Sequence, residues 1–576
     1  MRYWRASLLL TVCLSFFALS PSIAALTNSE IYETQDSVDP EIATVYFATT
    51  PDTTPEFSSS YLAVVDPNRK SGDLYRMLVC SSTKDPKCLE KKWAWEYRAL
   101  YPVCTTSDSL NCIENFYAIN SDGKKISAKF VETLPSPNTF AADPSLRIPQ
   151  GSGFTVWQID GANGDGSNLF GVIVGEHGGE FNEGRITKNI TGDPFDFFAG
   201  IQPITWKPLP TTGHTYWRNL PAPPPYPAGE INAEFGSAGG SCQVFAEGRC
   251  GEKTSFNSDS RYGITFRTSS KSQPWFRGRM NSAEVSVSSI SSGGYKFNIE
   301  GAPTRIPILE GQTNYKNVPL KACGSYEGYG PTFQDFVTKS GGRKMSQGDS
   351  GYWANLLYEC WKPWLDPKAK AIQTRWNFNS ISQIDSFRNQ VVQSCSVNLP
   401  LAGFVTTNAS IYSDGPPEWN ELTNSLEYKV AAPHFDPNGK DLVGTYSLVM
   451  DEKVAKCIYK MTSAPISATV EVLSDDGEQS VATSSLGIEN GFLRLSATGF
   501  HYSAPTIKVK FEQPKPVVIP TPIQSSPSTP TTPAPQITTQ AATKVITSKT
   551  ITCVKGKSIR KITGINPKCP IGYKKK

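Results

Sequence analysis

One short stretch contains residue types that hydrolytic enzymes use. Gln347-Gly-Asp-Ser-Gly351 contains GDSG, the sequence around the nucleophile of chymotrypsin-like proteases. Such an enzyme also needs a histidine and an aspartate upstream of the serine. His177 in GEHGGE and His214 in TGHTYW both lack the AAHC context of that histidine. We therefore interpret GDSG as a turn.

A second stretch, Glu176-His-Gly-Gly-Glu180, places two carboxylates beside an imidazole. Zinc proteases carry their ligands one turn apart on a helix. Gly178 and Gly179 disfavour a helix, and no third ligand accompanies the segment. We predict a polar loop here and no metal site.

Calcium is the one cofactor for which the sequence offers a place. The segment Asp160–Asn168 is rich in glycine and in oxygen-bearing side chains, and Asp160, Asn163 and Asp165 are its candidate ligands. It lacks the ligand spacing and the closing glutamate of an EF-hand. We expect an ordinary turn-rich loop, with loose calcium binding as the alternative. We interpret His434–Asp441 in the same way, as a hairpin turn.

The cysteines predict a disulfide framework. The chain has thirteen cysteines, and one of them, Cys13, lies in an apolar N-terminal run. Without Cys13 an even number remains, which in an exported chain indicates disulfides. A zinc site would more usually show C-x2-C pairs or nearby histidines. Three pairs share the spacing C-x7-C and a fourth lies near the end: Cys80–Cys88, Cys104–Cys112, Cys242–Cys250 and Cys553–Cys569. The other four cysteines allow three pairings, of which we favour Cys323–Cys360 with Cys395–Cys457.

The N-terminus has the features of a secretory signal peptide. Arg2 and Arg5 precede an apolar run over residues 6–19, and Ser22-Ile-Ala24 is a small-x-small cleavage site. The run is too short for a membrane span. We expect residues 1–24 to be removed and the mature chain to be exported. No later segment approaches the roughly 18 consecutive apolar residues of a transmembrane helix.

Charge is unevenly distributed along the chain. The formal net charge is +4, but eleven basic residues and no acidic one follow Glu512, so residues 1–512 carry −7. A cationic tail after an acidic body favours an anionic partner for the tail. The alternative is that the lysines only keep the chain end hydrated. The predicted contacts with an anionic cell-wall polymer or envelope surface are Lys555, Lys557, Arg560, Lys561, Lys568, Lys574, Lys575 and Lys576.

The body of the chain has the pattern of a mainly β protein. Ile466–Val472 and Ile507–Phe511 alternate apolar or small residues with polar ones, as half-buried strands do. Ser474–Gly477 and Glu489–Gly491 supply turns. Similar strand patterns occur at residues 44–49, 153–158, 170–174, 262–267 and 283–288. One helix is predicted, from a cap at Ser382 to Gln393.

We predict several antiparallel sandwich-like or barrel-like domains stapled by local disulfides, then a disordered linker and a small basic tail closed by a disulfide. The linker holds eight prolines among Thr, Ser, Ala and Gln and lacks the apolar residues that a core needs. The predicted divisions are the signal peptide 1–24, a domain with two C-x7-C staples over 25–225, a domain with a short helix over 226–395, a sandwich-like domain over 396–512, the linker 513–550 and the tail 551–576.

Clustered tryptophans raise the question of glycan binding. Trp353, Trp361, Trp364 and Trp376 fall within 24 residues. Exposed aromatic rings stack on sugars, but aromatic residues of β domains are more often buried. We expect these rings to be buried, with a glycan site as the alternative. The sequence has no phosphate-binding glycine loop, and we predict no nucleic-acid partner.

Several motifs resemble one family of proteins. The end of the chain, CVKGK followed by KCPIGYKKK, is similar to a C-terminal module that follows Pro/Thr-rich spacers in exported multidomain proteins of Actinobacteria. Pro274–Arg279 with Glu300–Thr304, and Leu401–Asn408 with Val443–Met450, resemble parts of large secreted proteins of that group, as does Cys104–Glu114. The resemblance implies an exported, envelope-associated protein and supplies no catalytic residue.

These features predict an exported interaction protein of the cell surface, adhesin-like or receptor-like, whose basic tail keeps it at the envelope. The alternative is a secreted polysaccharide-binding protein or hydrolase. A glycosidase needs a pair of carboxylates, and the sequence singles out no pair among its 52 acidic residues. No catalytic residue is therefore predicted.

Overall fold

The computed structural model describes the greater part of the body and the strands of the tail. The described residues are 44–50, 60–65, 76–91, 93–135, 138–161, 168–179, 181–182, 185–186, 194–208, 219–221, 231–233, 242–246, 249–269, 274–291, 293–314, 344–348, 358, 361–381, 389–413, 415–463, 465, 467–473, 479–481, 483–502, 506–513, 549–555, 558–564 and 574–575.

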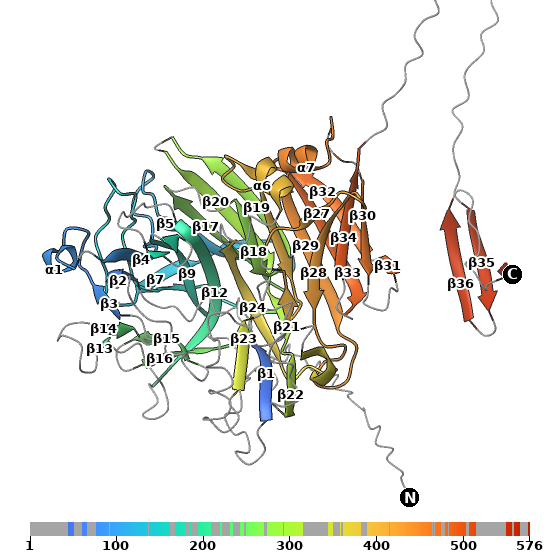
Figure 1. Cartoon of the computed structure of the whole chain (residues 1–576), viewed down its shortest axis with the longest axis horizontal. Helices are drawn as coiled ribbons and strands as arrows, with labels where there is room; N and C mark the ends of the chain where they lie inside the picture. Colours follow the sequence, from blue (N-terminus) through green and yellow to red (C-terminus); the bar gives the residue numbers. More distant parts are fainter. Residues whose placement is uncertain are drawn as a thin grey trace, which may run out of the picture. The chain divides into compact units, whose positions relative to one another are not determined.

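The chain forms two compact units, Met1–Lys515 (unit 1) and Pro516–Lys576 (unit 2). Unit 1 is mainly β, as the sequence predicted, and most of its strands pair antiparallel (Figure 1). Its largest sheet closes on itself. The strands of this large sheet are β2 (Tyr61–Val65), β3 (Arg76–Val79), β4 (Ala94–Leu100), β7 (Lys129–Thr133), β8 (Thr155–Gln158), β9 (Leu169–Gly179), β12 (Pro194–Pro208), β13 (Asn219–Pro221), β14 (Ile231–Ala233), β15 (Cys242–Ala246), β16 (Arg249–Lys253), β18 (Trp275–Arg279), β21 (Thr304–Pro307), β24 (Ile372–Ser380), β25 (Gly403–Thr407), β29 (Val443–Asp451), β32 (Thr483–Glu489) and β33 (Phe492–His501).

Two further sheets pack with the large one. The five-stranded sheet, in the order β19-β20-β17-β5-β6, contains β5 (Cys112–Ile119), β6 (Lys125–Ser127), β17 (Arg261–Thr268), β19 (Asn281–Ser289) and β20 (Tyr295–Ala302). The six-stranded sheet contains β26 (Ile411–Tyr412), β27 (Glu418–Asn420), β28 (Ser425–Ala431), β30 (Ser467–Leu473), β31 (Gln479–Val481) and β34 (Thr506–Glu512). The smaller pairings join β1 (Thr44–Thr50), β22 (Glu310–Asn314) and β23 (Lys344–Gly348), and β10 (Phe181–Asn182) with β11 (Arg185–Ile186).

Each sequence segment predicted as a strand overlaps a strand of unit 1. The turn predicted at Glu489–Gly491 joins β32 to β33, with Glu489 and Phe492 facing each other across the hairpin. Asn490 and Gly491 have φ angles of 52° and 80°. Two successive positive φ angles are those of a type I′ turn, which is why Asn-Gly marks this hairpin so clearly in the sequence.

Strand pairing in unit 1 crosses both of the boundaries predicted near residues 225 and 395. Strand β14 pairs with β3 across the first, and β18 pairs in parallel with β25 across the second. Met1–Lys515 is accordingly one compact unit. The alternation of polar and apolar residues along a strand indicates which face is buried, but it does not indicate which other strand it pairs with.

One aromatic core lies between the large sheet and the five-stranded sheet. Its rings come from strands far apart in sequence, and they pack with centroid separations of 5.1–6.4 Å: Phe197, Phe266, Phe276, Phe297 and Phe378. These are the separations at which aromatic rings attract one another. The side chains on the other face of the five-stranded sheet point away from this core.

The parallel contact between β18 and β25 brings together two of the segments that carry the family resemblance. Trp275 lies against Gly403, where an added Cβ would be 2.1 Å from the indole ring. The indole Nε1 of Trp275 donates to Ser396 Oγ at 2.8 Å. Both motifs thus have a structural role, because the ring and the glycine fit one another.

The helices found among the described residues of unit 1 are short: α1 (Pro86–Leu89), the 3-10 helix η3 (Lys362–Trp364), α6 (Gln390–Ser396) and α7 (Glu452–Ile458). The predicted cap at Ser382 lies outside the described residues, and the described helix α6 is capped by Asn389, whose Oδ1 accepts from Val392 N at 3.2 Å. Helix α7 was not predicted. Among the described residues no helix has the length and apolar character needed to cross a membrane.

Three of the predicted disulfides are present in the described residues. Cys80–Cys88 and Cys104–Cys112 close local loops, and Cys395–Cys457 joins α6 to α7, which lie side by side (Figure 1). Cys242 and Cys250 belong to the paired strands β15 and β16, but their side chains lie outside the described part. Cys323–Cys360 and Cys553–Cys569 stay predictions, because their side chains are also outside it.

Unit 2 contains a small antiparallel sheet. Its strands are β35 (Lys549–Lys555), β36 (Ser558–Gly564) and β37 (Lys574–Lys575), in the order β36-β35-β37. Strand β37 is the lysine-rich end of the chain, and Cys553 faces Lys575 across the pairing. The sequence predicted a loop closed by Cys553 and Cys569. The structure adds that Lys574 and Lys575, at the basic end of the chain, pair with β35.

The close packing of Trp275 on Gly403 makes a prediction about stability. We expect Gly403→Ala to lower the free energy of unfolding by about 1–3 kcal/mol, because the new methyl group must displace the indole ring. Gly487→Ala is the matched control on strand β32, where a Cβ meets nothing within 4 Å. Urea unfolding of the full chain measures both, and equal midpoints for the two variants would contradict the packing described.

Candidate functional site

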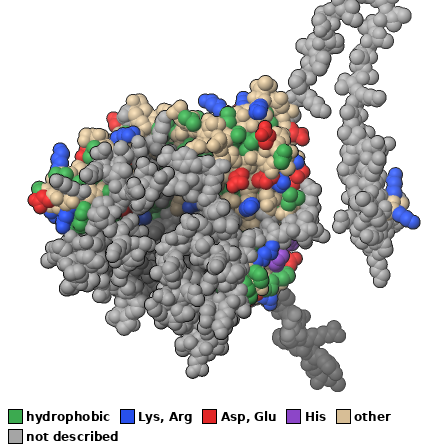
Figure 2. Space-filling model, viewed as in Figure 1, with side chains coloured by type: hydrophobic (Ala, Val, Ile, Leu, Met, Phe, Trp, Pro, Cys, Tyr) green, Lys and Arg blue, Asp and Glu red, His purple; other side chains and the backbone are tan. Residues whose placement is uncertain are grey.

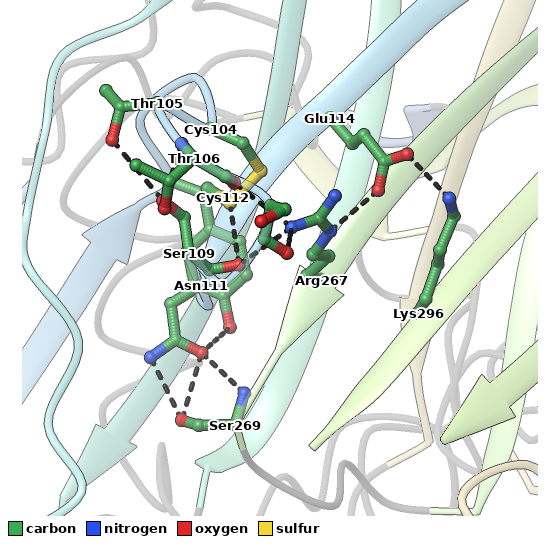
Figure 3. The surroundings of a disulfide bond; sticks show 12 residues. Cys104, Thr105, Thr106, Ser109, Asn111, Cys112, Glu114, Arg267, Ser269 and Lys296 are labelled. Carbon is green, nitrogen blue, oxygen red and sulfur yellow. Dashed lines mark hydrogen bonds and ion pairs between the residues drawn. A yellow bond between two sulfur atoms is a disulfide. The ribbon is translucent and has the colours of Figure 1, made fainter. Parts of the chain in front are cut away.

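A short disulfide-closed loop and the sheet face beside it form a polar surface in the described part of unit 1. The loop runs from Cys104 to Cys112 and leads into β5 (Figure 3). Thr105, Thr106 and Ser107 are exposed. Ser109 Oγ lies 3.3 Å and 2.9 Å from the hydroxyls of Thr105 and Thr106. The loop therefore presents hydroxyl groups on a backbone whose two ends are joined by the disulfide.

Arg267 of strand β17 holds this loop from the sheet side. Its Nη1 donates to the carbonyl oxygens of Thr106 at 3.2 Å, Ser107, and Ser109 at 3.5 Å, while its Nε donates to Glu114 Oε2 at 2.7 Å (Figure 3). A planar guanidinium has five N–H groups and can satisfy several acceptors at fixed angles. The loop conformation is thus set by side chains as well as by the disulfide.

Asn111 fixes the other end of the loop. Its φ angle is 54°, in the left-handed region that asparagine tolerates better than most residues. Its side-chain Oδ1 accepts from Ser269 N at 2.8 Å and from Ser269 Oγ at 3.0 Å (Figure 3). Loop and strand β17 are therefore joined at two places, by Arg267 and by Asn111.

Glu114 carries the charge that balances this cluster. Lys296 Nζ donates to Glu114 Oε1 at 2.5 Å, so one carboxylate binds cations from β17 and β20 (Figure 3). Partial burial opposes ionisation, but the hydrogen bonds from Lys296 and Arg267 outweigh it and lower the pKa of Glu114. The Glu114 carboxyl is consequently ionised at neutral pH.

Tyr117 lies in the middle of the same face. Its ring covers Gly263 of β17, where an added Cβ would be 2.3 Å from the ring. Its hydroxyl lies 2.9 Å from Asn298 Oδ1 and 3.2 Å from Glu300 Oε2. Burial, followed by the charge of Glu300, raises the pKa of Tyr117, so the hydroxyl stays protonated. The ammonium of Lys125 lies 3.4 Å from the ring centroid.

The far end of the face repeats the pattern of paired charges. Arg261 Nε donates to Glu300 Oε1 at 2.9 Å, and its Nη2 donates to Glu284 Oε1 at 3.0 Å. Arg494 reaches the other oxygen of Glu284 at 3.1 Å. The described surface of unit 1 likewise shows acidic and basic side chains interspersed (Figure 2). The face as a whole offers many fixed donors and acceptors and little net charge.

The histidine segment is not the polar loop that we predicted. Glu176 and His177 lie within β9, paired with β4 and β12, because the neighbouring strands supply the backbone partners that a loop would lack. Glu176 is fully buried and accepts from Tyr97 OH at 2.9 Å and Tyr101 OH at 2.6 Å. Burial and the Glu176 carboxylate raise the pKa of Tyr101 well above its usual value.

His177 projects from the opposite face of β9, since successive residues of a strand alternate. Its Nε2 lies 2.9 Å from Glu96 Oε1, and Tyr61 OH donates to the same oxygen at 2.6 Å. Glu96 and Glu176 therefore lie on opposite faces of the sheet. They do not form the facing carboxylate pair that a glycosidase needs.

The remaining candidate residues from the sequence are those for a metal ion, for calcium and for a serine nucleophile. Among the described residues there is no group of three or more His, Cys, Asp and Glu that would hold a metal ion. Asp160 accepts from Gln158 Nε2 at 3.0 Å, whereas Asn163 and Asp165 lie outside the described part. Only Gln347 and Gly348 of the GDSG segment are described, at the end of β23.

Two of the clustered tryptophans are buried, as expected. Trp361 and Trp376 are each 1% exposed, and Trp376 Nε1 donates to Gly301 O at 2.9 Å. Trp364 packs edge-on against Trp361 at 6.1 Å. Trp353 lies outside the described residues. Trp361 and Trp376 therefore serve packing, whereas Trp364 is only partly buried.

The predicted tail contacts fall on the strands of unit 2 where they are described. Lys555 lies in β35, Arg560 and Lys561 in β36, and Lys574 and Lys575 in β37. Lys574 and Lys575 are exposed. The remaining three, Lys557, Lys568 and Lys576, lie outside the described part.

Comparison with known proteins found no match to this chain among protein-family models, curated proteins or solved structures. The Actinobacteria resemblance accordingly stays a prediction. Local sequence motifs do not reveal the sheet face beside the Cys104–Cys112 loop, because its residues come from strands separated by more than 150 positions. The alternation of Arg261, Gly263, Thr265 and Arg267 along one strand was the available signal.

Removing the Arg267 guanidinium tests whether it holds the loop. We expect Arg267→Gln to lower the free energy of unfolding by about 1–3 kcal/mol, because three loop carbonyls and Glu114 lose their donor. Hydrogen exchange across residues 104–112 should become faster. Lys296→Gln is the control, since it removes a more exposed partner of Glu114 and should cost about 1 kcal/mol or less. Unchanged exchange in Arg267→Gln would contradict this role.

The lowered pKa of Glu114 predicts a pH dependence of stability. Its ion pairs contribute above the unfolded pKa of about 4.3, and the contribution is lost as the pH falls through the lower folded value. We therefore expect the wild type to be more stable than Glu114→Gln at pH 7 and the difference to shrink below about pH 4. Glu421→Gln, at an exposed position, is the control. Acid titration of chemical unfolding midpoints measures this, and a constant difference from pH 7 to pH 3 would refute it.

Proposed function

We propose that this chain is an exported interaction protein of the cell surface, held at the envelope by contact between its basic tail and an anionic polymer. The observation that carries the proposal is the charge distribution. Eleven basic residues and no acidic one follow Glu512, whereas the preceding residues carry −7. Cationic clusters attract anionic polymers over distances set by the ionic strength.

The division of the chain supports this assignment. Ten of the eleven basic residues that follow Glu512 belong to unit 2, which is compact in itself and contains no acidic residue. The segment between the last strand of unit 1 and β35 has the composition of an extended, semi-rigid spacer. A spacer of that kind lets an anchored tail and a partner-binding body act independently.

Export is supported by the disulfides and by the N-terminal sequence. Three disulfides occur among the described residues, and such bonds persist chiefly in oxidising compartments. The N-terminal residues have the pattern of a signal peptide. The alternative function, a secreted polysaccharide-binding protein or hydrolase, is favoured in its binding form by the polar face of the five-stranded sheet.

Binding to isolated cell envelopes tests the tail. In the full chain, we expect neutralising substitutions to Gln at the eight predicted tail positions to abolish sedimentation with envelopes, and we expect salt to weaken wild-type binding as the Debye length falls from about 10 Å at 0.1 M to about 3 Å at 1 M. The control carries the same loss of charge at eight exposed lysines of unit 1: Lys84, Lys124, Lys129, Lys368, Lys370, Lys440, Lys453 and Lys460.

Retention of binding by the tail variant would refute the proposal. Equal loss in the control would also count against it, because binding would then follow total charge instead of the tail. Binding that persists unchanged at high salt would exclude a contact driven by charge.

A further inference from the structure

We propose that one face of the small sheet of unit 2 binds a linear phosphodiester polymer, and that the cations of the other face take no part in this contact. The binding face is defined by two cross-strand rows, Lys555–Ser558 and Arg560–Cys553–Lys575. The inference rests on the proposed function, because it names the surface and the class of polymer through which the basic tail is held.

Strand pairing places these residues on one face. Lys555 is the register partner of Ser558, while Cys553 is paired with Arg560 on one side and with Lys575 on the other. Cys553 precedes Lys555 by two positions on β35, and Ser558 precedes Arg560 by two positions on β36. Since successive residues of a strand alternate between the two faces of a sheet, both rows belong to the same face.

The spacing of the three cations suits a chain of separate negative charges. Arg560 and Lys575 belong to strands on either side of β35, so their backbones are about 9–10 Å apart. Lys555 is diagonal to both of them across one strand boundary, at about 7–8 Å. Neighbouring charges of one polymer can therefore be bound by different residues at the same time.

The residue types on this face favour phosphate. Lysine ammonium groups bind phosphate as point charges, and an arginine guanidinium can donate to two phosphate oxygens at once. Serine hydroxyls are further common phosphate donors, and Ser558 lies directly across from Lys555. Unit 2 contains no acidic side chain that could neutralise these cations. The face therefore combines the donors that phosphate groups use with an unbalanced positive charge.

The opposite face of the same strands has fewer cations. It holds Lys561, the register partner of Thr552, and Lys574, the register partner of Val554. The binding face holds four cations among the described strand residues of unit 2, with Lys549 as the fourth. Two faces of one small sheet thus differ in charge, and a polyanion is attracted more strongly to the face with more cations.

Binding of the full chain to end-labelled poly(glycerol phosphate), measured by fluorescence anisotropy, tests the proposal. Two double variants remove the same charge from the same two strands: Arg560→Gln with Lys575→Gln on the binding face, and Lys561→Gln with Lys574→Gln on the opposite face. We expect the first pair to raise Kd by about tenfold, because two charge-assisted contacts are lost, and the second pair to change it by about twofold or less.

A charge-conserving variant separates loss of contact from loss of folding. Arg560→Lys with Lys575→Arg keeps both cations in the row and should bind within about threefold of wild type. Adding Lys555→Gln to the weakened double variant should raise Kd further. It should also make the dependence of Kd on salt shallower, because fewer counterions are released when fewer phosphates are contacted.

Equal weakening by the two Gln double variants would overturn the inference, since binding would then follow total charge instead of one face. Loss of binding in the charge-conserving variant would also count against it, because cations in the row would not suffice. Absence of binding to poly(glycerol phosphate), or an equal or lower Kd for polygalacturonate, would contradict the selectivity for phosphate.

Sedimentation with envelopes decides the proposed function separately. If Gln at all eight predicted tail positions abolishes sedimentation, the tail stays the anchor whichever face or polymer the anisotropy assay favours. If sedimentation persists, the proposed function fails, and the binding face has no part in retention at the envelope. Failure of this inference is thus distinguishable from failure of the proposed function.

Discussion

The buried guanidinium of Arg279 sits at the corner on which the architecture of unit 1 depends. It is fully buried, and its Nη1 donates to the carbonyl oxygens of Thr407 at 3.2 Å and Ala409 at 2.5 Å. Thr407 is the last residue of β25 in the large sheet, and Ala409 lies between β25 and β26 of the six-stranded sheet. The same guanidinium lies 4.3 Å from the ring centroid of Tyr412 in β26. One charged group thus fixes the point where the chain leaves one sheet for the next.

Burying a charge is costly unless its hydrogen bonds are supplied by the fold. For Arg279, the backbone carbonyls of Thr407 and Ala409 supply acceptors for Nη1. Glu176 meets this requirement with the hydroxyls of Tyr97 and Tyr101. In both cases the polar group favours one register and one corner geometry, because a shifted strand would leave the charge without its partners. Apolar burial alone would tolerate several alternatives.

The Cys104–Cys112 loop and the adjoining face of the five-stranded sheet are also held in place by polar contacts. The Cys104–Cys112 loop is closed by its disulfide and held by Arg267 and Asn111, and the adjoining face consists of ion pairs that fix one another. Individual exposed ion pairs contribute little to stability. Here they hold the loop and the neighbouring side chains of β5, β17 and β20 in set orientations.

The sequence alone determined the mainly β class, the strand segments, the Asn-Gly hairpin, the local disulfides and the separation of charge along the chain. Each follows from neighbouring residues: alternation of polarity, turn conformations that only certain residues adopt, short cysteine spacings, and simple counts. The pairing of Cys395 with Cys457 was favoured among three alternatives and is present in the structure.

Only the tertiary structure decided which strands pair. It placed β18 beside β25, put Glu176 and His177 inside a central strand, and gathered Glu114, Arg267 and Lys296 on one face. The local pattern around Glu176 suggested a loop, because two glycines and three polar residues are unfavourable in an isolated strand. Partners on both sides of β9 and buried tyrosine hydroxyls reverse that preference. Contacts over long sequence separations satisfy buried polar groups in ways that no short segment encodes.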